Sequence, residues 1–374
     1  MGNIKRIETY FLKVPVIPPI RDSTFYVQSL GIPVIKIIDG EDNTGWGFGW
    51  NTAGGSELSL ELFEKYIAKA LIGQDVTKRA QVVEKIFHEQ NLGWDYRLGR
   101  NGLGVMVASM VDIALWDILC KMASLPLWKV LGGHRDKVGT YDTHGGWLSW
   151  TKEELVNNAR ERVKLGYKAI KLKVGSENPA DDYDRIAAVR SAVGKNVDIM
   201  IDANTKWDLE TAKRWGRKFD DFDLFWFEEP MNPLDIKSHR ALKEDILTPI
   251  ALGESLHNKF AFRDYIDQQA VDFVQVDVTK VAGITEWLQV SNYAEMNNLT
   301  VYPHTNIQQP IHVQLVAGIK NASVVEDVPW LLDVWKYPAV PKDGYFELTE
   351  NSGTGTEIRD SAIAQFVQNK NVFQ

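Results

Sequence analysis

The chain has 374 residues, which is more than one ordinary domain needs and fits a barrel of about 250 residues with a second domain. Its net charge of −8 argues against nucleic acid as a partner, and its single cysteine, Cys120, excludes a disulfide framework. No apolar run reaches the roughly 18 residues of a membrane span and no signal-peptide core opens the chain, so we expect a cytoplasmic protein without a membrane partner.

The first 130 residues mix strand and helix patterns, which predicts an α+β domain. Alternating apolar residues predict two strands with a hairpin turn after the second, and helical periodicity predicts three helices. The predicted strands are Ile4–Val14 and Ile32–Asp39, the turn is 39–45, and the helices are 56–71, 77–90 and 103–123. The last helix is apolar on nearly every side, so it should be buried.

From residue 131 to residue 326, short β-branched runs alternate with amphipathic stretches. Strand followed by helix, repeated, predicts a parallel sheet. This many strands favour a closed barrel over an open doubly wound sheet, and no glycine-rich dinucleotide or P-loop motif follows any run. The predicted strands are Lys137–Asp142, Lys168–Val174, Val197–Asp202, Asp223–Glu228, Pro249–Glu254, Asp272–Asp277, Leu299–His304 and Ser323–Glu326.

No clear helix follows the last predicted strand, so the fold class is α/β, a modified (β/α)8 barrel of the form (β/α)7β. Residues 327–374 contain a further strand pattern, Tyr345–Thr349. We expect this C-terminal segment to return to the first domain.

Ionisable side chains stand at the carboxyl ends of the predicted strands, about one strand–helix unit apart. In order they are Lys171 with Lys173, Asp202, Glu228, Glu254, Asp277, His304 and Glu326. Because the carboxyl ends of barrel strands meet at one mouth, these side chains should converge there.

Asp202, Glu228 and Glu254 end three consecutive strands. Close carboxylates repel one another strongly, and a divalent cation relieves that repulsion. A donor set made only of oxygen atoms favours Mg²⁺ over Zn²⁺. The pattern therefore predicts one Mg²⁺ per subunit, although any one of these acids alone would be read as a helix cap or an ion-pair partner.

Lys171 and Lys173 lie two residues apart on one strand, so their side chains point the same way. Mutual repulsion should lower the pKa of one of them and make it a usable base. The competing interpretation is a pair of lysines that extend past the strand end into water.

His304 and Asp277 end neighbouring strands, so the carboxylate can hold the imidazole in one tautomer. We expect this pair to face Lys173 across the mouth as a second acid/base group. Glu326 could hydrogen-bond a substrate carboxylate if it is protonated, or be an ordinary surface acid. Further candidates for substrate contacts follow their strands directly, namely Asn204, Lys280 and His144.

These motifs resemble the mandelate racemase subgroup of the enolase superfamily, over nearly the whole chain. The matching segments are Lys171–Lys173, Ile201–Asn204, Trp226–Pro230, Gly253–Ser255, Val276–Lys280 with Gly283, and His304, while Gly99–Leu103 and Asp112–Asp117 resemble the family's capping domain. The resemblance implies a capping domain over 1–130, a barrel over 131–326 and a C-terminal segment over 327–374 that returns to the capping domain. Within the subgroup, 48–55, 141–146 and 325–330 are most similar to sugar-acid dehydratases of the L-talarate/galactarate kind.

The resemblance also assigns roles. It implies that the Mg²⁺ ligands are Asp202, Glu228 and Glu254, with Glu229 behind them. Lys173 and the His304–Asp277 pair would be acid/base groups on opposite faces of the substrate. Lys171 would contact the substrate carboxylate, and Glu326 would donate to the enediolate. Specificity would come from loops 15–30 and 46–56, with Arg21, Asp22 and Tyr26 as candidates. Family members are commonly homo-oligomers, often octamers, which we expect here by analogy.

The implied reaction removes the proton next to a carboxylate, passes through an enediolate and eliminates the 3-hydroxyl to give a 2-keto-3-deoxy sugar acid. The substrate would be an aldarate or an aldonate. A racemase, epimerase or cycloisomerase on the same barrel is the alternative, and a non-catalytic barrel is disfavoured by the intact ionisable set. The sequence leaves open which of Lys173 and His304 is the base.

Overall fold

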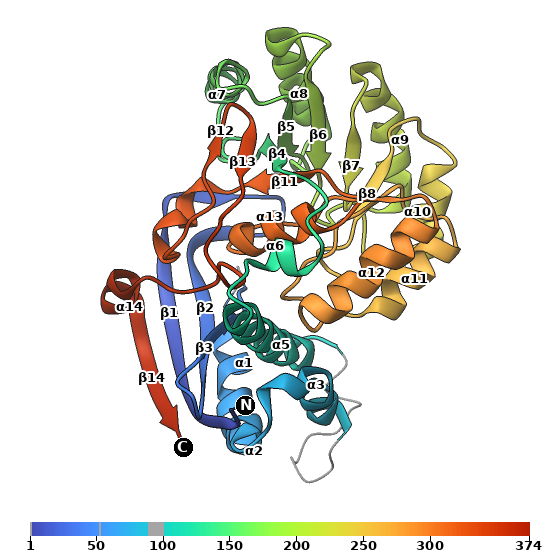
Figure 1. The fold of residues 1–374 in the computed structure, drawn as a ribbon. Helices are drawn as coiled ribbons and strands as arrows, with labels where there is room; N and C mark the ends of the chain where they lie inside the picture. Colours follow the sequence, from blue (N-terminus) through green and yellow to red (C-terminus); the bar gives the residue numbers. More distant parts are fainter. Residues whose placement is uncertain (1, 52–53, 89–100) are drawn as a thin grey trace.

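The structure is a computed structural model that describes residues 2–51, 54–88 and 101–374. Three predicted features fall partly outside the described residues: 89–90 of the second helix, 52–53 of the second specificity loop, and Gly99 with Arg100 of the capping motif. The chain folds into an antiparallel sheet with its own helices and a parallel barrel beside it (Figure 1).

The capping domain is built on a four-stranded antiparallel sheet in the order β14-β1-β2-β3. The strands are β1 Ile4–Arg21, β2 Tyr26–Asp39, β3 Thr44–Phe48 and β14 Val367–Phe373. The helices are α1 Ser56–Leu62, α2 Ala68–Leu71, α3 Arg79–His88 and α5 Leu103–Met122, with a π-helical turn at Phe63–Ile67 and a 3₁₀ turn at Val76–Lys78. The predicted elements are confirmed within the described residues, but β1 and β2 run further than predicted.

Helix α5 packs directly on strand β3 because two glycines let the backbones approach. A Cβ atom at Gly47 would lie 1.8 Å from the carbonyl oxygen of Met110, and one at Gly45 would lie 2.0 Å from that of Ala114. By length and composition α5 could cross a membrane, yet 83% of its most apolar window is buried inside the protein. That burial is the property of a core helix.

The barrel contains the eight predicted strands in parallel pairing. They are β4 Lys137–Asp142, β5 Ala169–Lys173, β6 Asp198–Asp202, β7 Trp226–Glu228, β8 Ile250–Leu252, β9 Phe273–Val274, β10 Thr300–Val301 and β11 Val324–Asp327. Neighbours pair in sequence from β4 to β10, and β11 returns to pair with β4. The last barrel strand therefore lies beside the first, as in a closed barrel and unlike an open sheet in which the two are at opposite edges.

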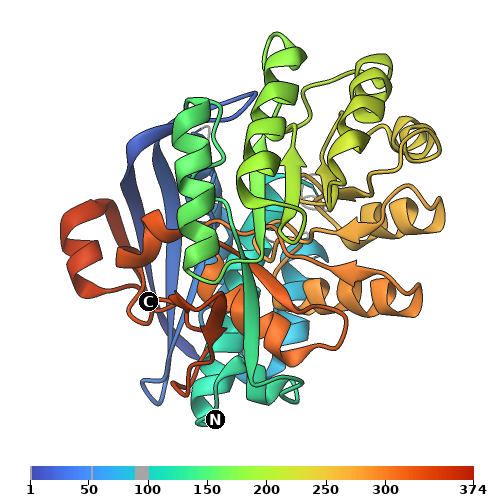
Figure 2. The same ribbon diagram turned by 90° about the horizontal axis from the view of Figure 1, so that it is seen from above.

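Helices follow the first seven barrel strands and surround them, as the green, yellow and orange ribbons in Figure 2 show. They are α7 Lys152–Lys164, α8 Pro179–Val193, α9 Leu209–Phe219, α10 Ile236–Lys243, α11 Lys259–Asp267, α12 Ile284–Met296 and α13 Gln309–Gly318, and α6 Leu127–Val130 precedes β4. Between β11 and β12, where the described chain has no gap, the only helical turn is a 3₁₀ segment, Pro329–Val334. The (β/α)7β form is confirmed.

Polar residues fix where several barrel helices begin. A side-chain oxygen that accepts from the first free backbone N–H groups stabilises a helix start by about 1 kcal/mol. The caps are Thr151, which forms a reciprocal capping box with Glu154, and Asn178, Asp208, Asp235 and Asn258. These caps end the loops that carry the mouth, so they also limit how far those loops can move.

The C-terminal segment does not return to the capping domain as one unit. Strand β13 (Tyr345–Glu347) pairs antiparallel with the start of β4, and β12 (Pro341–Lys342) lies beyond it. The prediction is wrong for this part, because β11 pairs with β4 only from Gly139 onward and leaves the edge at Lys137 and Val138 to β13. Helix α14 (Asp360–Phe366) and β14 do return, and β14 pairs with β1.

The barrel interior consists of an apolar layer with the ionisable side chains directly above it. Tyr141, Ala169, Met200, Trp226 and Ala251 form a buried cluster. Side chains on a strand alternate, so the residue two positions further faces the same interior, closer to the mouth. In this way Ala169 is followed by Lys171, Met200 by Asp202, Trp226 by Glu228, Tyr302 by His304 and Val324 by Glu326.

We predict that Gly47→Ala lowers the free energy of unfolding by about 3 kcal/mol, because the added methyl group would overlap the backbone of α5. Denaturant unfolding measures this change. Gly40→Ala is the control, since its nearest neighbour would be 3.9 Å away, and it should stay within about 0.5 kcal/mol. Equal effects of the two substitutions would contradict the close packing of α5 on β3.

Candidate active site

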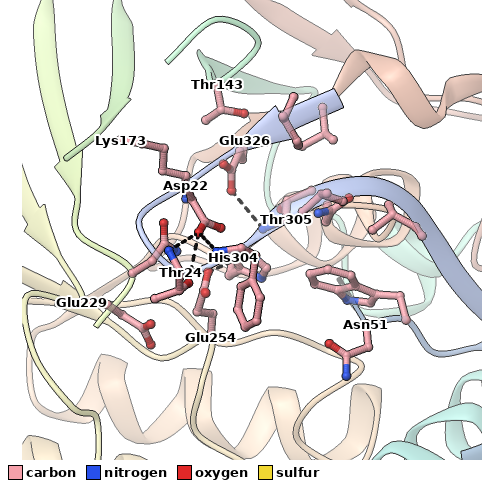
Figure 3. Close-up of a pocket in the computed structure, with 18 of the residues that line it drawn as sticks. Asp22, Thr24, Asn51, Thr143, Lys173, Glu229, Glu254, His304, Thr305 and Glu326 are labelled. Atoms are coloured by element: carbon pink, nitrogen blue, oxygen red, sulfur yellow. Dashed lines mark hydrogen bonds and ion pairs between the residues drawn. The ribbon is translucent and has the colours of Figure 1, made fainter. Parts of the chain in front are cut away.

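A cavity of about 290 Å³ lies at the carboxyl ends of the barrel strands, beneath the capping strands. Its size is near the lower end of small-molecule sites. The predicted residues that line it are Asp22, Lys173, Asn204, Glu254, Lys280, His304 and Glu326 (Figure 3). The two parts of the chain therefore meet around one cavity.

Lys171 lies below this cavity and holds the acids of three strands together. Its Nζ is 3.0 and 3.1 Å from the two carboxylate oxygens of Glu228 and 3.0 Å from Oε1 of Glu326. The nearest oxygen of Asp202 is 3.8 Å away. Lys171, Asp202 and Glu228 are buried, which excludes the interpretation of lysines extending into water.

Each of the three predicted metal ligands has a cationic partner in the structure. Lys173 donates to Asp202, Lys171 contacts Glu228, and His304 Nε2 lies 2.8 Å from Oε2 of Glu254. Buried carboxylates are costly without such compensation.

The His304 ring is held from its other side by Asp277. The His304 Nδ1–Asp277 Oδ2 distance is 3.1 Å, and Gln308 donates to the same oxygen. The second oxygen of Asp277 accepts from the backbone N–H of Thr279 at 2.7 Å. The predicted pairing of histidine and aspartate is therefore present, and the additional donors orient the carboxylate.

The carboxylates outnumber the cations in this cluster. The acids are Asp202, Glu228, Glu229, Glu254, Asp277 and Glu326, and the cations are Lys171, Lys173 and the protonated form of His304. Burial and the charge of Asp202 raise the pKa of Glu228 to about 7. Burial and the charge of Glu254 likewise raise the pKa of Glu229.

A hard divalent cation fits this chemistry, because the donors are oxygen atoms and the cluster carries uncompensated negative charge. In the described residues no three His, Cys, Asp or Glu side chains are gathered as a ready cage for an ion. The reason is visible in the contacts, since each candidate carboxylate is turned toward a lysine or a histidine. A bound metal ion would replace the lysine and histidine side chains as the partner of these carboxylates.

One expectation about the lysines is wrong for this arrangement. Burial and the charge of Lys171 act to lower the pKa of Lys173, but the contact with Asp202 and the charges of Glu254 and Glu228 outweigh them and raise it. Repulsion between the two lysines is therefore not the dominant influence while Asp202 is the partner of Lys173.

Three predicted substrate contacts do not line the cavity. Arg21 and Tyr26 pair across β1 and β2 and are exposed, because strand alternation turns Ile20 and Asp22 inward and Arg21 outward. His144 packs edge-on against Trp150, and its neighbour Thr143 lines the cavity instead.

Two tryptophans cover the predicted acid/base groups. Trp50 stacks on His304 at 5.7 Å between ring centroids, and the Nζ of Lys173 lies 5.4 Å from the ring centroid of Trp147. The Nζ of Lys280 lies 5.0 Å from the ring centroid of Trp50. Sequence reasoning did not assign these tryptophans to the site, since aromatic residues in loops are usually packing residues.

Three non-glycine residues at the mouth have a left-handed backbone conformation. The φ angles are 43° at Asn204, 63° at Thr205 and 35° at Glu229, which are values that residues other than glycine rarely adopt. These residues follow β6 and β7, where the chain turns away from the candidate ligands. The backbone N–H of Asn204 donates to Asp202 Oδ1 at 2.8 Å, so the tight turn also fixes a ligand carboxylate.

Comparison with known proteins gives two family matches. Residues 6–132 match the mandelate racemase / muconate lactonizing enzyme N-terminal domain. Residues 154–362 match the family described as enolase C-terminal domain-like. Together these matches cover the capping domain and nearly all of the barrel.

Three relatives are similar over almost the whole chain. L-talarate/galactarate dehydratase of Salmonella typhimurium is 33% identical over 93% of this chain and 87% of its own length. Its crystal structure with Mg and L-lyxarohydroxamate has a TM-score of 0.92 at 31% identity. That match covers 100% of this chain and 94% of the other. Arabinonate dehydratase of Saccharolobus solfataricus is 29% identical over 97% of this chain and 99% of its own. The 3,6-anhydro-alpha-L-galactonate cycloisomerase of Streptomyces coelicolor is 29% identical over 95% and 97%.

We predict that Lys171→Met destabilises the protein by about 3–5 kcal/mol in the presence of a chelator, because Glu228 and Glu326 lose their buried cation. Chemical denaturation measures the change. Lys168→Met removes a lysine that is exposed near the start of the same strand and should change stability by less than about 0.5 kcal/mol. If Lys171→Met lowers the free energy of unfolding no more than Lys168→Met does, Glu228 and Glu326 do not depend on Lys171.

Proposed function

Since the chain belongs to the mandelate racemase/muconate lactonizing enzyme family of the enolase superfamily, we propose that it is a Mg²⁺-dependent hydro-lyase that dehydrates acid sugars. The observation that carries the proposal is the placement of Lys173 and His304 on one cavity, each bonded to a different candidate ligand carboxylate. An amine and an imidazole from β5 and from the end of β10 can then reach one substrate from two sides.

Asp202, Glu228 and Glu254 would hold the metal ion. Their oxygen-only donor set and the excess of buried negative charge support this assignment. Bound there, Mg²⁺ supplies the positive charge that makes a proton next to a carboxylate acidic enough to remove. The relatives that carry Mg in their crystal structures include L-talarate/galactarate dehydratase.

Lys173 and His304 are the groups that move protons. One of them takes the proton from C2 of the substrate, and the other gives a proton to the 3-hydroxyl as the C3–O bond breaks and water leaves. The enol that remains becomes a 2-keto-3-deoxy acid by taking a proton at C3. Asp277 holds the His304 ring through Nδ1, so Nε2, which contacts Glu254 in this structure, is the nitrogen that would exchange the proton.

Aromatic side chains shield these groups. Trp50 and Trp147 pack against His304 and Lys173, and capping strands line the cavity. Glu326 lines the cavity and contacts Lys171, which is buried below it, so we assign the binding of the substrate carboxylate to this pair.

Isomerisation is the second candidate function, and the similarity to a cycloisomerase favours keeping it. A racemase, epimerase or cycloisomerase would use the same two proton-transfer groups without losing a hydroxyl. We further propose a location in the cytoplasm and a homo-oligomer such as an octamer, with an acid sugar as the small-molecule partner.

We predict that Lys173→Ala and His304→Asn each lower kcat by about 10²–10⁴-fold on the acid sugar that the Mg²⁺-loaded protein dehydrates best, because each removes one proton-transfer group. A panel of acid sugars assayed for 2-keto acid identifies that substrate. Lys168→Ala serves as the control and should retain activity, since Lys168 is exposed.

The same variants distinguish base from acid. In D₂O, the variant that keeps the base should still exchange the C2 hydrogen of the substrate while forming no keto acid. If the panel gives inverted or cyclised products instead of keto acids, isomerisation replaces dehydration. If neither variant affects any turnover, the proposed proton transfer is wrong.

Trp226 should position the candidate ligand Glu228, because its indole Nε1 donates to Glu228 Oε2 at 3.0 Å from the apolar layer below. We predict that Trp226→Phe raises the Mg²⁺ concentration for half-activation by about 10–100-fold. Tyr302→Phe is the matched control. It removes the hydroxyl from a ring that packs against Trp226, and that hydroxyl makes no hydrogen bond to Glu228. An unchanged Mg²⁺ requirement in a folded Trp226→Phe protein would refute this role.

A further inference from the structure

We propose that the cavity selects acid sugars with a single carboxylate over dicarboxylates, and that Asp22 is the residue that makes this selection. The inference rests on the proposed function and narrows its substrate class. Family membership leaves the choice open, because the relatives include enzymes named for a diacid, galactarate, and for a monoacid, arabinonate. The choice between a monoacid and a diacid must therefore be inferred from the residues that line this cavity.

Asp22 follows β1 and points into the cavity. It is 8% exposed and lines the space together with Lys173 and His304 (Figure 3). Its Oδ1 accepts from the backbone N–H of Thr24 at 2.7 Å, from the Thr24 hydroxyl at 3.0 Å and from the backbone N–H of Phe25 at 2.6 Å. No donor in the described parts of the chain bonds Oδ2, so this oxygen remains for a ligand.

The turn that carries Asp22 is fixed to the barrel. The backbone N–H of Asp22 donates to the carbonyl of Phe25 at 3.1 Å, and the hydroxyl of Ser23 donates to the carbonyl of Ala203 at 2.6 Å. The backbone N–H of Leu148 donates to the carbonyl of Arg21 at 2.9 Å. The carboxylate therefore cannot swing away from a bound molecule without breaking these bonds.

A fixed carboxylate distinguishes hydroxyl groups from carboxylates. A substrate hydroxyl can donate a charge-assisted hydrogen bond to Oδ2. A second substrate carboxylate has no proton to donate at neutral pH and meets a like charge in a confined space. In the proposed function the first carboxylate of the substrate binds at the floor of the cavity beside Lys173, whose positive charge offsets this repulsion.

The described capping residues bring no cation to the cavity that would bind a second carboxylate, and Thr24 and Asn51 are their neutral polar side chains there. They line the cavity mainly with apolar side chains, which are Val16, Ile20, Phe25, Val27 and Leu30. Arg21 points outward, so no cation from the described capping residues lines the space. Lys280 lies on Trp50, which stacks on His304, and so belongs to the reacting end of the cavity.

The test compares aldonates with aldarates of matching configuration, for example galactonate with galactarate, which differ only in a hydroxymethyl or a carboxylate at C6. With the Mg²⁺-loaded protein we expect kcat/KM to favour the aldonate of the best pair by about tenfold or more. Asp22→Asn should reduce this preference by about tenfold, mainly by raising kcat/KM for the aldarate. The asparagine keeps the Oδ1 acceptor of the turn and removes the charge.

Asp42→Asn is the matched control, because it removes one negative charge from an exposed position of the capping domain away from the cavity. It should leave the preference unchanged. An aldarate preferred by the wild-type protein overturns the inference, and so does a preference that Asp22→Asn leaves unchanged. If Lys280→Met lowers kcat/KM for the aldarate and Asp22→Asn does not change the preference, Lys280 makes the selection and the inference is overturned.

Binding separates this inference from the proposed function. Calorimetric titration of the Mg²⁺-loaded Lys173→Ala protein measures the affinity for each member of a pair without turnover. Tighter binding of the aldonate, reduced by adding Asp22→Asn, supports the inference even if no dehydration is found. Tighter binding of the aldarate overturns the inference even if dehydration is confirmed.

Discussion

The mouth of the barrel depends on the compensation of buried negative charge. Parallel strands deliver their terminal side chains to one place, and here most of those side chains are acids. Two like charges about 4 Å apart repel by about 4 kcal/mol at the effective dielectric typical of protein sites. Lys171 and Lys173 from β5 and His304 from the end of β10 offset this repulsion, because each contacts a carboxylate of the cluster.

This compensation links stability to catalysis. The amine and the imidazole that the proposed chemistry needs are the partners of Asp202 and Glu254, the carboxylates that would bind the metal ion. A cation that binds these carboxylates competes with the lysine and the histidine for them. Metal binding and the availability of the acid/base groups are then one equilibrium, which explains why the cluster combines more acids than its own cations can neutralise.

Much of this arrangement could be predicted from the sequence, because strand alternation is a short-range rule. The β-branched runs gave the barrel strands, and the last ionisable residue of each run gave Asp202, Glu228, Asp277 and His304 at the mouth. The same rule explains the failure at Arg21, since β1 continues past Val14 and its alternation turns Arg21 outward. The partners themselves were not predictable, because the contact of Lys173 with Asp202 or of Trp226 with Glu228 depends on distances between strands.

The capping domain and the barrel divide the work, and buried polar contacts hold them in one geometry. Asp112 on α5 accepts from Arg79 at 2.6 Å and from the backbone N–H of Thr285 on α12 at 2.9 Å, so one buried carboxylate joins the two parts. Within the capping domain, Asp117 on α5 accepts from the backbone N–H of Trp46 at 3.0 Å. The Asp112 anchor uses none of the residues that line the cavity, so a side chain such as Asp22 can change without breaking it. The two proposals thus assign proton transfer to residues of the barrel and substrate choice to a residue of the capping domain.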